Sequence, residues 1–224
     1  MHDAAVRHFP IGGAVVALWF VVSAGADAGD LRLQPLMENV YAVLQPWDQR
    51  YNDANSLIVI GDDAVAVVDA QARPAGVAQV IAFVRQLTQL PVRYVINTHW
   101  HADHTQGNAA WRARFGETVQ FVGHDSLFDD VPRRAAKDLR ERVAAVKANV
   151  ASAQREIVLG NDENGAALDP AGLARQRAGI ERALKWLQAN EDARFLLPDV
   201  TYHKRLRLSL GGIDLELLHF KAHT

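Results

Sequence analysis

The chain has 224 residues, of which 49% are hydrophobic and 22% are charged. This is the composition of an ordinary globular protein and argues against extensive disorder. The 24 basic and 26 acidic residues leave a formal net charge of -2 with no long basic run, so electrostatics gives no reason to expect a nucleic acid or an anionic membrane as a partner. The absence of cysteine excludes disulfides, iron–sulfur clusters and zinc–thiolate sites, and leaves histidine and carboxylate as the strong metal ligands.

The first residues have the layout of an export signal. An apolar run at residues 11–22 lies between Arg7 and a stretch of small residues that ends in Ala-Asp-Ala at 26–28. This order is typical of a signal peptide, and the apolar run is too short for a membrane span of about 20 residues. We therefore predict a signal peptide over residues 1–28, a periplasmic or secreted location, and no stable membrane association after cleavage.

Strands and helices are expected to alternate in the next part of the chain. Apolar runs predict strands at residues 40–44, 56–60, 64–68, 92–96 and 118–122. Apolar residues at helical spacing predict a helix over residues 77–87, stopped by Pro91, and a short helix is expected at 108–115. The segment 47–55 (WDQRYNDAN) is expected to be a loop. This order implies a sheet covered by helices, with functional loops at the carboxyl ends of strands.

The segment from Pro132 to Asn190 has helical periodicity, and it is interrupted by a turn-rich stretch at residues 161–165. Asp169 and Pro170 are suited to cap and begin the second helix. We therefore predict a helical hairpin inserted at about residues 126–200, for which a lid, a dimer surface and a structural insertion all remain open as roles. After it, alternating leucines around Gly211-Gly212 predict a β-hairpin.

Residues 98–108 (THWHADHTQGN) concentrate potential metal ligands: His99, His101, Asp103 and His104 lie within six consecutive positions. Packing does not explain such a cluster, because histidine and aspartate are usually exposed or satisfied singly. On an extended backbone residues i and i+2 point the same way, so His99 and His101 can hold one cation, and Asp103 and His104 follow on the next turn. The spacing suits one metal ion or two adjacent ones. Asp69, after an apolar strand, is either a cap or a group that binds a histidine N–H.

The segment His99-Trp100-His101-Ala102-Asp103-His104 resembles the His-x-His-x-Asp-His hallmark of the metallo-β-lactamase superfamily. Asp69, Gly107-Asn108 and Ala222-His223-Thr224 support the resemblance in the same order along the chain. It implies an α/β (α+β) fold, the αββα sandwich, in residues 29–224, with the first half, a helical insertion and the opening hairpin of the second half. It also implies that His99, His101 and His223 hold a first zinc ion, that Asp103 and His104 belong to a second, and that Asp69 supports the ligands from behind.

Three neutral imidazoles leave zinc with an open position, where the pKa of bound water falls to about 7. We therefore expect a zinc hydrolase in which metal-bound hydroxide attacks an ester or amide bond, of β-lactam or lactone type, in a small-molecule substrate. Asp103 is the candidate catalytic residue, passing a proton to the leaving group. His124 is a weaker candidate than His223 for the third ligand of the first metal ion. His203 and His219 are expected at the surface or, at most, in hydrogen bonds to the ligands.

Two alternatives remain open at this stage. The resemblance calls for a further aspartate that bridges two metal ions and a last histidine, and neither follows within the chain, which ends at Thr224. The chain is therefore expected to be a fragment of a longer protein, and a truncated metal-binding protein without activity is the first alternative. The second is an iron-dependent persulfide dioxygenase of the same fold.

Overall fold

The computed structural model describes residues 31–45, 54–162 and 164–220. The expected signal peptide, most of the loop expected at residues 47–55, and His223 lie outside the described residues.

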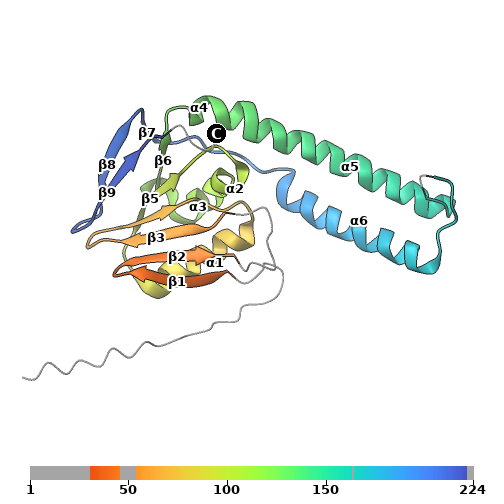
Figure 1. Cartoon of the computed structure of the whole chain (residues 1–224), viewed down its shortest axis with the longest axis horizontal. Coiled ribbons are helices and arrows are strands. Elements are labelled where there is room, and N and C mark those ends of the chain that lie inside the picture. Colours follow the sequence, from red (N-terminus) through yellow and green to blue (C-terminus); the bar gives the residue numbers. More distant parts are fainter. Residues whose placement is uncertain (1–30, 46–53, 163, 221–224) are drawn as a thin grey trace, which may run out of the picture.

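A seven-stranded sheet forms the centre of the molecule, in the order β1-β2-β3-β4-β5-β6-β7 (Figure 1). The strands from β1 to β4 pair antiparallel, and those from β4 to β7 pair parallel. Parallel strands bring their carboxyl ends to one edge, so the loops after β4, β5 and β6 leave the sheet side by side. The strands are β1 (Arg32–Met37), β2 (Val40–Leu44), β3 (Ser56–Ile60), β4 (Val65–Val68), β5 (Val92–Asn97), β6 (Gln120–His124) and β7 (Val200–Tyr202).

Both faces of this sheet are covered, by different elements. Helices α1 (Pro74–Leu87) and α3 (Asn108–Phe115) pack on one face, where Val80 and Trp111 lie in the same buried cluster as Val67. On the other face lies a two-stranded sheet made of β8 (Arg205–Ser209) and β9 (Asp214–Leu218), and its Leu208 packs with Val122 of β6. Strands covered on both sides read as continuous apolar runs. The predicted α/β fold is confirmed.

The turn between β8 and β9 ties the small sheet to the large one. Gly211 and Gly212 both have positive φ, 75 and 65, which glycine adopts without steric cost. The N–H of Leu210 donates to Ile213 across this two-residue turn, and the carbonyl of Leu210 accepts from Asp63 N–H at 2.8 Å. The predicted hairpin is confirmed, and it is joined to the β3–β4 turn.

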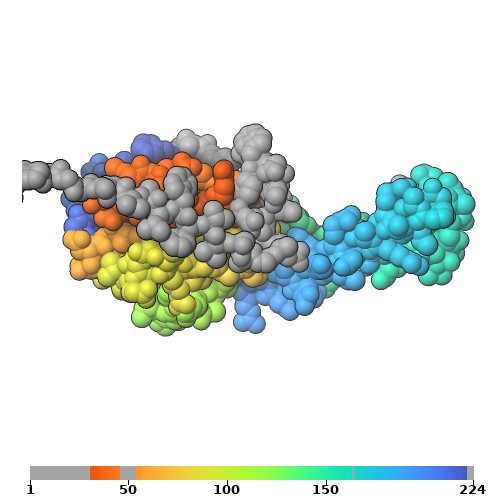
Figure 2. Space-filling model, turned by 90° about the horizontal axis from the view of Figure 1, so that it is seen from below, coloured from red at the N-terminus to blue at the C-terminus, as the bar shows by residue number. Residues whose placement is uncertain are grey.

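A pair of long helices projects from the body of the molecule (Figures 1 and 2). It follows α4 (Leu127–Asp130) and a π-helical turn (Val131–Ala135), and consists of α5 (Ala136–Leu159) and α6 (Pro170–Asn190). The carboxylate of Asp169 caps α6 by accepting the N–H of Gly172, as its position predicts. None of the helices in the described ranges combines the length and apolarity needed to cross a lipid bilayer.

Several details differ from the sequence expectations. Helix α1 begins at Pro74 rather than at residue 77, and part of the ligand-rich segment forms a short helix, α2 (Ala102–Thr105). Strand β6 begins at Gln120 rather than at residue 118, because Gly116–Thr118 forms a 3-10 turn. Strand β1 was not predicted; it is an exposed edge strand that contains Pro35, so it lacks the alternation of a half-buried strand. Strand β7 was also missed, and its first residue, Val200, coincides with the expected end of the helical insertion.

Candidate metal centre

The ligand-rich loop leaves the end of β5 and is held there by two buried asparagines. Asn97, the last residue of β5, donates from Nδ2 to the carbonyl of His104 at 2.6 Å and to Oδ1 of Asn108 at 3.1 Å. Asn108 returns a hydrogen bond from its own Nδ2 to Oδ1 of Asn97 at 2.8 Å. Because buried amides are costly to leave unpaired, these bonds fix both ends of the loop.

A glycine lets this loop pack against the turn that follows β4. Gly107 N–H donates to the carbonyl of Gln71 at 2.8 Å. A Cβ atom at Gly107 would lie 2.2 Å from the carbonyl oxygen of Ala70 and 2.4 Å from that of Gln71, so no larger residue fits there without moving backbone. Trp111 Nε1 also donates to Ala70 at 3.1 Å. The two loops that carry the candidate ligands therefore form one packed unit.

Four candidate ligands converge within this unit. His99 Nε2 lies 2.9 Å from His101 Nδ1, the rings of His99 and His104 have centroids 4.0 Å apart, and His104 Nε2 lies 3.3 Å from Asp103 Oδ2. Two imidazole nitrogens bound to one tetrahedral zinc ion lie roughly 3.3 Å apart, given bonds of about 2.0–2.1 Å. The nitrogens of His99 and His101 therefore lie at about the separation that one zinc ion requires.

Asp69 orients one of these histidines from behind. Its carboxylate accepts the N–H of Thr98 and the Thr98 hydroxyl, both at 2.9 Å, and lies 2.8 Å from His104 Nδ1. With Nδ1–H donating to Asp69, the Nε2 atom of His104 faces Asp103. Asp69 thus accepts a loop N–H and contacts a histidine, and it caps no helix in the described residues: the residues at the starts of α1 and α2 are Arg73 and His101. A carboxylate behind a histidine is a common arrangement in metal sites.

The electrostatics of Asp103 and His104 are those of an ion pair. Burial lowers the pKa of His104, but hydrogen bonds to Asp103 and Asp69 and the charges of these carboxylates outweigh burial and raise it from 6.5 to about 9. Burial raises the pKa of Asp103, yet the hydrogen bond and charge of His104 lower it overall. Without a metal ion, the pair is therefore held together by a proton on His104, which a cation must displace.

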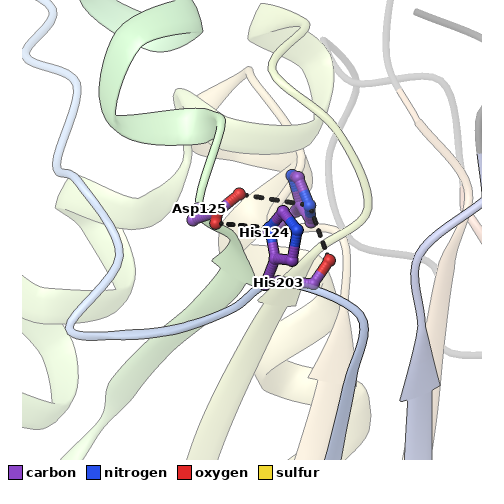
Figure 3. A group of neighbouring side chains, drawn as sticks. All are labelled: His124, Asp125 and His203. Carbon is purple, nitrogen blue, oxygen red and sulfur yellow. Dashed lines mark hydrogen bonds and ion pairs between the residues drawn. The ribbon is translucent and has the colours of Figure 1, made fainter.

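His124 lies in a different group of side chains, shown in Figure 3. Its Nδ1 accepts the N–H of Ser126 at 3.2 Å, which leaves the proton on Nε2, and Nε2 lies 3.1 Å from Asp125 Oδ1 and 3.0 Å from the carbonyl of His203. His219 stacks on its ring with centroids 3.6 Å apart. His124, Asp125 and His203 offer ligand atoms within 4.8 Å of one another. Among the described residues, this group brings its ligand atoms close enough together to hold a metal ion, and its hydrogen bonds also join β6 to the β7–β8 turn.

Residues that local sequence patterns do not reveal connect the ligand loop to the helical pair. The guanidinium of Arg134 lies 5.3 Å from the ring centroid of Trp100, whose ring in turn meets the His101 ring at 4.3 Å. Gln106 donates to Oδ1 of Asn190, at the end of α6, at 2.9 Å. Pairs this distant in sequence have no signal in local periodicity. The one local indication of such a contact is Trp100, an aromatic residue between His99 and His101.

Together, the fold and this donor set define an α/β protein with a candidate metal centre at the carboxyl edge of its sheet. The family model of the metallo-beta-lactamase superfamily matches residues 51–168, more than half of the chain. The chain belongs to the metallo-beta-lactamase superfamily. This family is largely one of metal-dependent hydrolases.

Solved structures of metallo-beta-lactamases are also similar to the chain. FIM-1 from Pseudomonas aeruginosa, in a mono-zinc form, is 20% identical over 47% of each chain, with a TM-score of 0.41. The protein from Erythrobacter litoralis is 23% identical over 48% of this chain and 47% of its own, with a TM-score of 0.40. That from Pontibacter korlensis is 15% identical over 84% of this chain and 59% of its own, with a TM-score of 0.46. The chain thus spans about half the length of these proteins.

Proposed function

We propose that the protein is a zinc-dependent hydrolase that cleaves an ester or amide bond of β-lactam or lactone type in a small molecule. The observation that carries this proposal is the convergence of His99, His101, Asp103 and His104, with the carboxylate of Asp69 on the far nitrogen of His104. A zinc ion bound to such ligands lowers the pKa of water to about 7 and polarises the bond that is attacked. His223 completes the first metal position in this proposal, on the resemblance alone.

The residues of the chain divide the remaining work. Asp69 holds His104 with Nε2 turned toward Asp103, so a cation meets a ring that needs no reorientation. Asp103 lies beside His104, and its carboxylate can accept a proton and pass it to the leaving group. Asn97 and Asn108 keep the loop in this geometry. Export of the protein by a signal peptide at residues 1–28, to the periplasm or the medium, is part of the same proposal.

The test combines metal content with hydrolysis. We expect the purified full chain to contain one or two zinc ions by mass spectrometry of the metals, and to hydrolyse a chromogenic β-lactam or a γ-lactone. A His101→Ala variant should lose the metal and the activity. Zinc without hydrolysis of either substrate would favour the inactive metal-binding protein, and iron with oxygen uptake on a persulfide would favour the dioxygenase.

A further inference from the structure

A cavity of about 540 Å3 lies between the candidate metal centre and the helical pair. The ligand loop contributes Trp100, His101 and Asp103 to its wall, and the two long helices contribute the opposite side, with Asp138 and Arg142 from α5 and Trp186 from α6. A molecule in this cavity touches the metal centre and the helices at the same time. The volume of the cavity falls in the range of small-molecule binding sites.

Two contacts place the helices relative to the ligand loop. Arg134, just before α5, stacks on Trp100, and Asn190, the last residue of α6, accepts a hydrogen bond from Gln106. Asn190 also donates to the carbonyl of Trp186 at 2.7 Å. Figure 1 shows that the start of α5 and the end of α6 lie beside the sheet while their other ends project away. The bases of the two helices, which carry Arg142 and Trp186, are therefore held at the cavity.

The helical side of the cavity carries one guanidinium, Arg142, one carboxylate, Asp138, and one indole, Trp186. Arg142 is exposed, and in the described part of the chain it forms no ion pair, although Asp138 lies one turn away on the same helix. Trp186 is half-buried. The Nε1 atom of Trp100 is enclosed by protein and has no hydrogen-bond partner among the described residues, so this residue offers the cavity its ring rather than its N–H. A guanidinium binds carboxylates with two parallel hydrogen bonds, and indole rings pack on apolar or aromatic groups.

We propose that the helical pair is the substrate-recognition wall of the enzyme, with Arg142 binding a carboxylate of the substrate and Trp186 packing on its apolar or aromatic portion. The preferred substrate is then an anionic ester or amide that carries such a group. The identity of the cleaved bond rests on the proposed hydrolase function, whereas the binding itself does not. Asp138 opposes the carboxylate and limits its affinity.

Hydrolysis of two matched esters tests this assignment. Mono-4-nitrophenyl glutarate carries a carboxylate, and 4-nitrophenyl pentanoate has a similar chain without one. Arg142→Gln should raise KM for the glutarate by about 10- to 100-fold, as expected for loss of a charged hydrogen bond, and leave KM for the pentanoate within about twofold. Asp138→Asn should lower KM for the glutarate. Equal effects of Arg142→Gln on both esters would overturn the assignment.

The control variant lies on the same helix. Arg155→Gln makes the same change on α5, about 20 Å along the helix axis from Arg142 at 1.5 Å per residue, and it should leave both esters unaffected. If Arg155→Gln raised KM for the glutarate as much as Arg142→Gln does, only the overall charge of the helix would matter. That result would contradict a specific site at Arg142.

A binding experiment separates this inference from the proposed hydrolase function. Calorimetry with naphthalene-2-carboxylate and naphthalene-2-carboxamide needs no hydrolysis, and repeating it in EDTA removes binding of the carboxylate to a metal ion. In EDTA, Arg142→Gln should abolish the preference for the carboxylate, and Trp186→Leu should weaken the binding of both ligands. If these results hold while the β-lactam, the γ-lactone and both esters all remain uncleaved, the hydrolase proposal fails and the recognition wall stands. A carboxylate preference that survives in Arg142→Gln in EDTA would overturn the wall.

Discussion

The loop at the sheet edge and the helical pair bring different degrees of burial to one cavity. Around the loop, Asn97 and Asn108 are 2% and 0% exposed and pair with each other. In contrast, α5 buries Val150 alone, and α6 buries only Gly172 and Leu187. Elements with few buried contacts open at lower free energy than a packed core. The candidate ligands therefore lie on the side of the cavity with the higher local stability, and the proposed recognition residues lie on the side that opens at lower free energy.

The largest expected difference between the two regions concerns glycines. Gly107→Ala should destabilise the fold by about 3 kcal/mol or more, because its Cβ would meet two backbone carbonyls. Gly179→Ala in α6 should instead stabilise it by about 0.5–1 kcal/mol, since the added Cβ lies no closer than 4.0 Å to Arg182 and alanine favours helix. Urea unfolding of both variants measures this. Equal and small effects would mean that the loop is as tolerant as the helices.

Removing the carboxylate behind His104 should affect metal binding more than stability. Asp69→Asn removes the negative charge and one of the two acceptor oxygens that serve Thr98 and His104, and such changes typically weaken metal affinity by about 10- to 100-fold. Competition with a zinc-binding dye measures the affinity, and Asp214→Asn on exposed strand β9 is the matched control. Unchanged zinc affinity in Asp69→Asn would show that His104 needs no orienting partner.

Zinc affinity should also depend on pH through His104. Its pKa of about 9 keeps the ring protonated at pH 7, and zinc requires the neutral ring. Affinity should therefore rise by up to about tenfold per pH unit from pH 7 and level off above pH 9. Calorimetry in buffers of different ionisation enthalpy should show about one proton released, and this proton should be missing in His104→Gln.

The same pKa shift predicts a pH dependence of the metal-free fold. A histidine pKa raised above 6.5 means that the folded state binds the proton more tightly than the unfolded state does. Its stabilising contribution is complete below pH 6.5 and is lost as the pH rises through about 9. In EDTA, the midpoint temperature of thermal unfolding should therefore fall more between pH 6.5 and about 9 for the wild type than for His104→Gln.

The smallest effect is expected within the helical pair. Lys147 of α5 pairs with Glu191, just after α6, at 2.8 Å, and both side chains are substantially exposed. Lys147→Gln should cost at most about 1 kcal/mol, because exposed ion pairs are screened by water and salt. Urea unfolding at low and high salt provides the measurement. A loss of unfolding free energy much above this value would show that the helical pair depends on this contact and is not a region of low local stability.

Local patterns predicted the elements that bury apolar residues at regular spacing. The strand expected at residues 40–44 and the helix at 108–115 coincide with β2 and α3. The patterns missed β1, an exposed edge strand, and β7, which has three residues and forms by pairing with β6. Such strands exist because a neighbour supplies their hydrogen bonds, and a single segment does not encode that neighbour.

Residue spacing alone predicts the chemistry available to this protein: four candidate nitrogen and oxygen ligands within six residues, directly after an apolar strand, in a chain without cysteine. Residue spacing is enough to predict this cluster, because residues within six positions of one another stay close in space. Tertiary contacts alone bring Asp69 to His104, His124 to the carbonyl of His203, and the helices to the cavity beside His101. These partners are separated by tens of residues, and they meet through parallel strand pairing and the docking of the two helix ends.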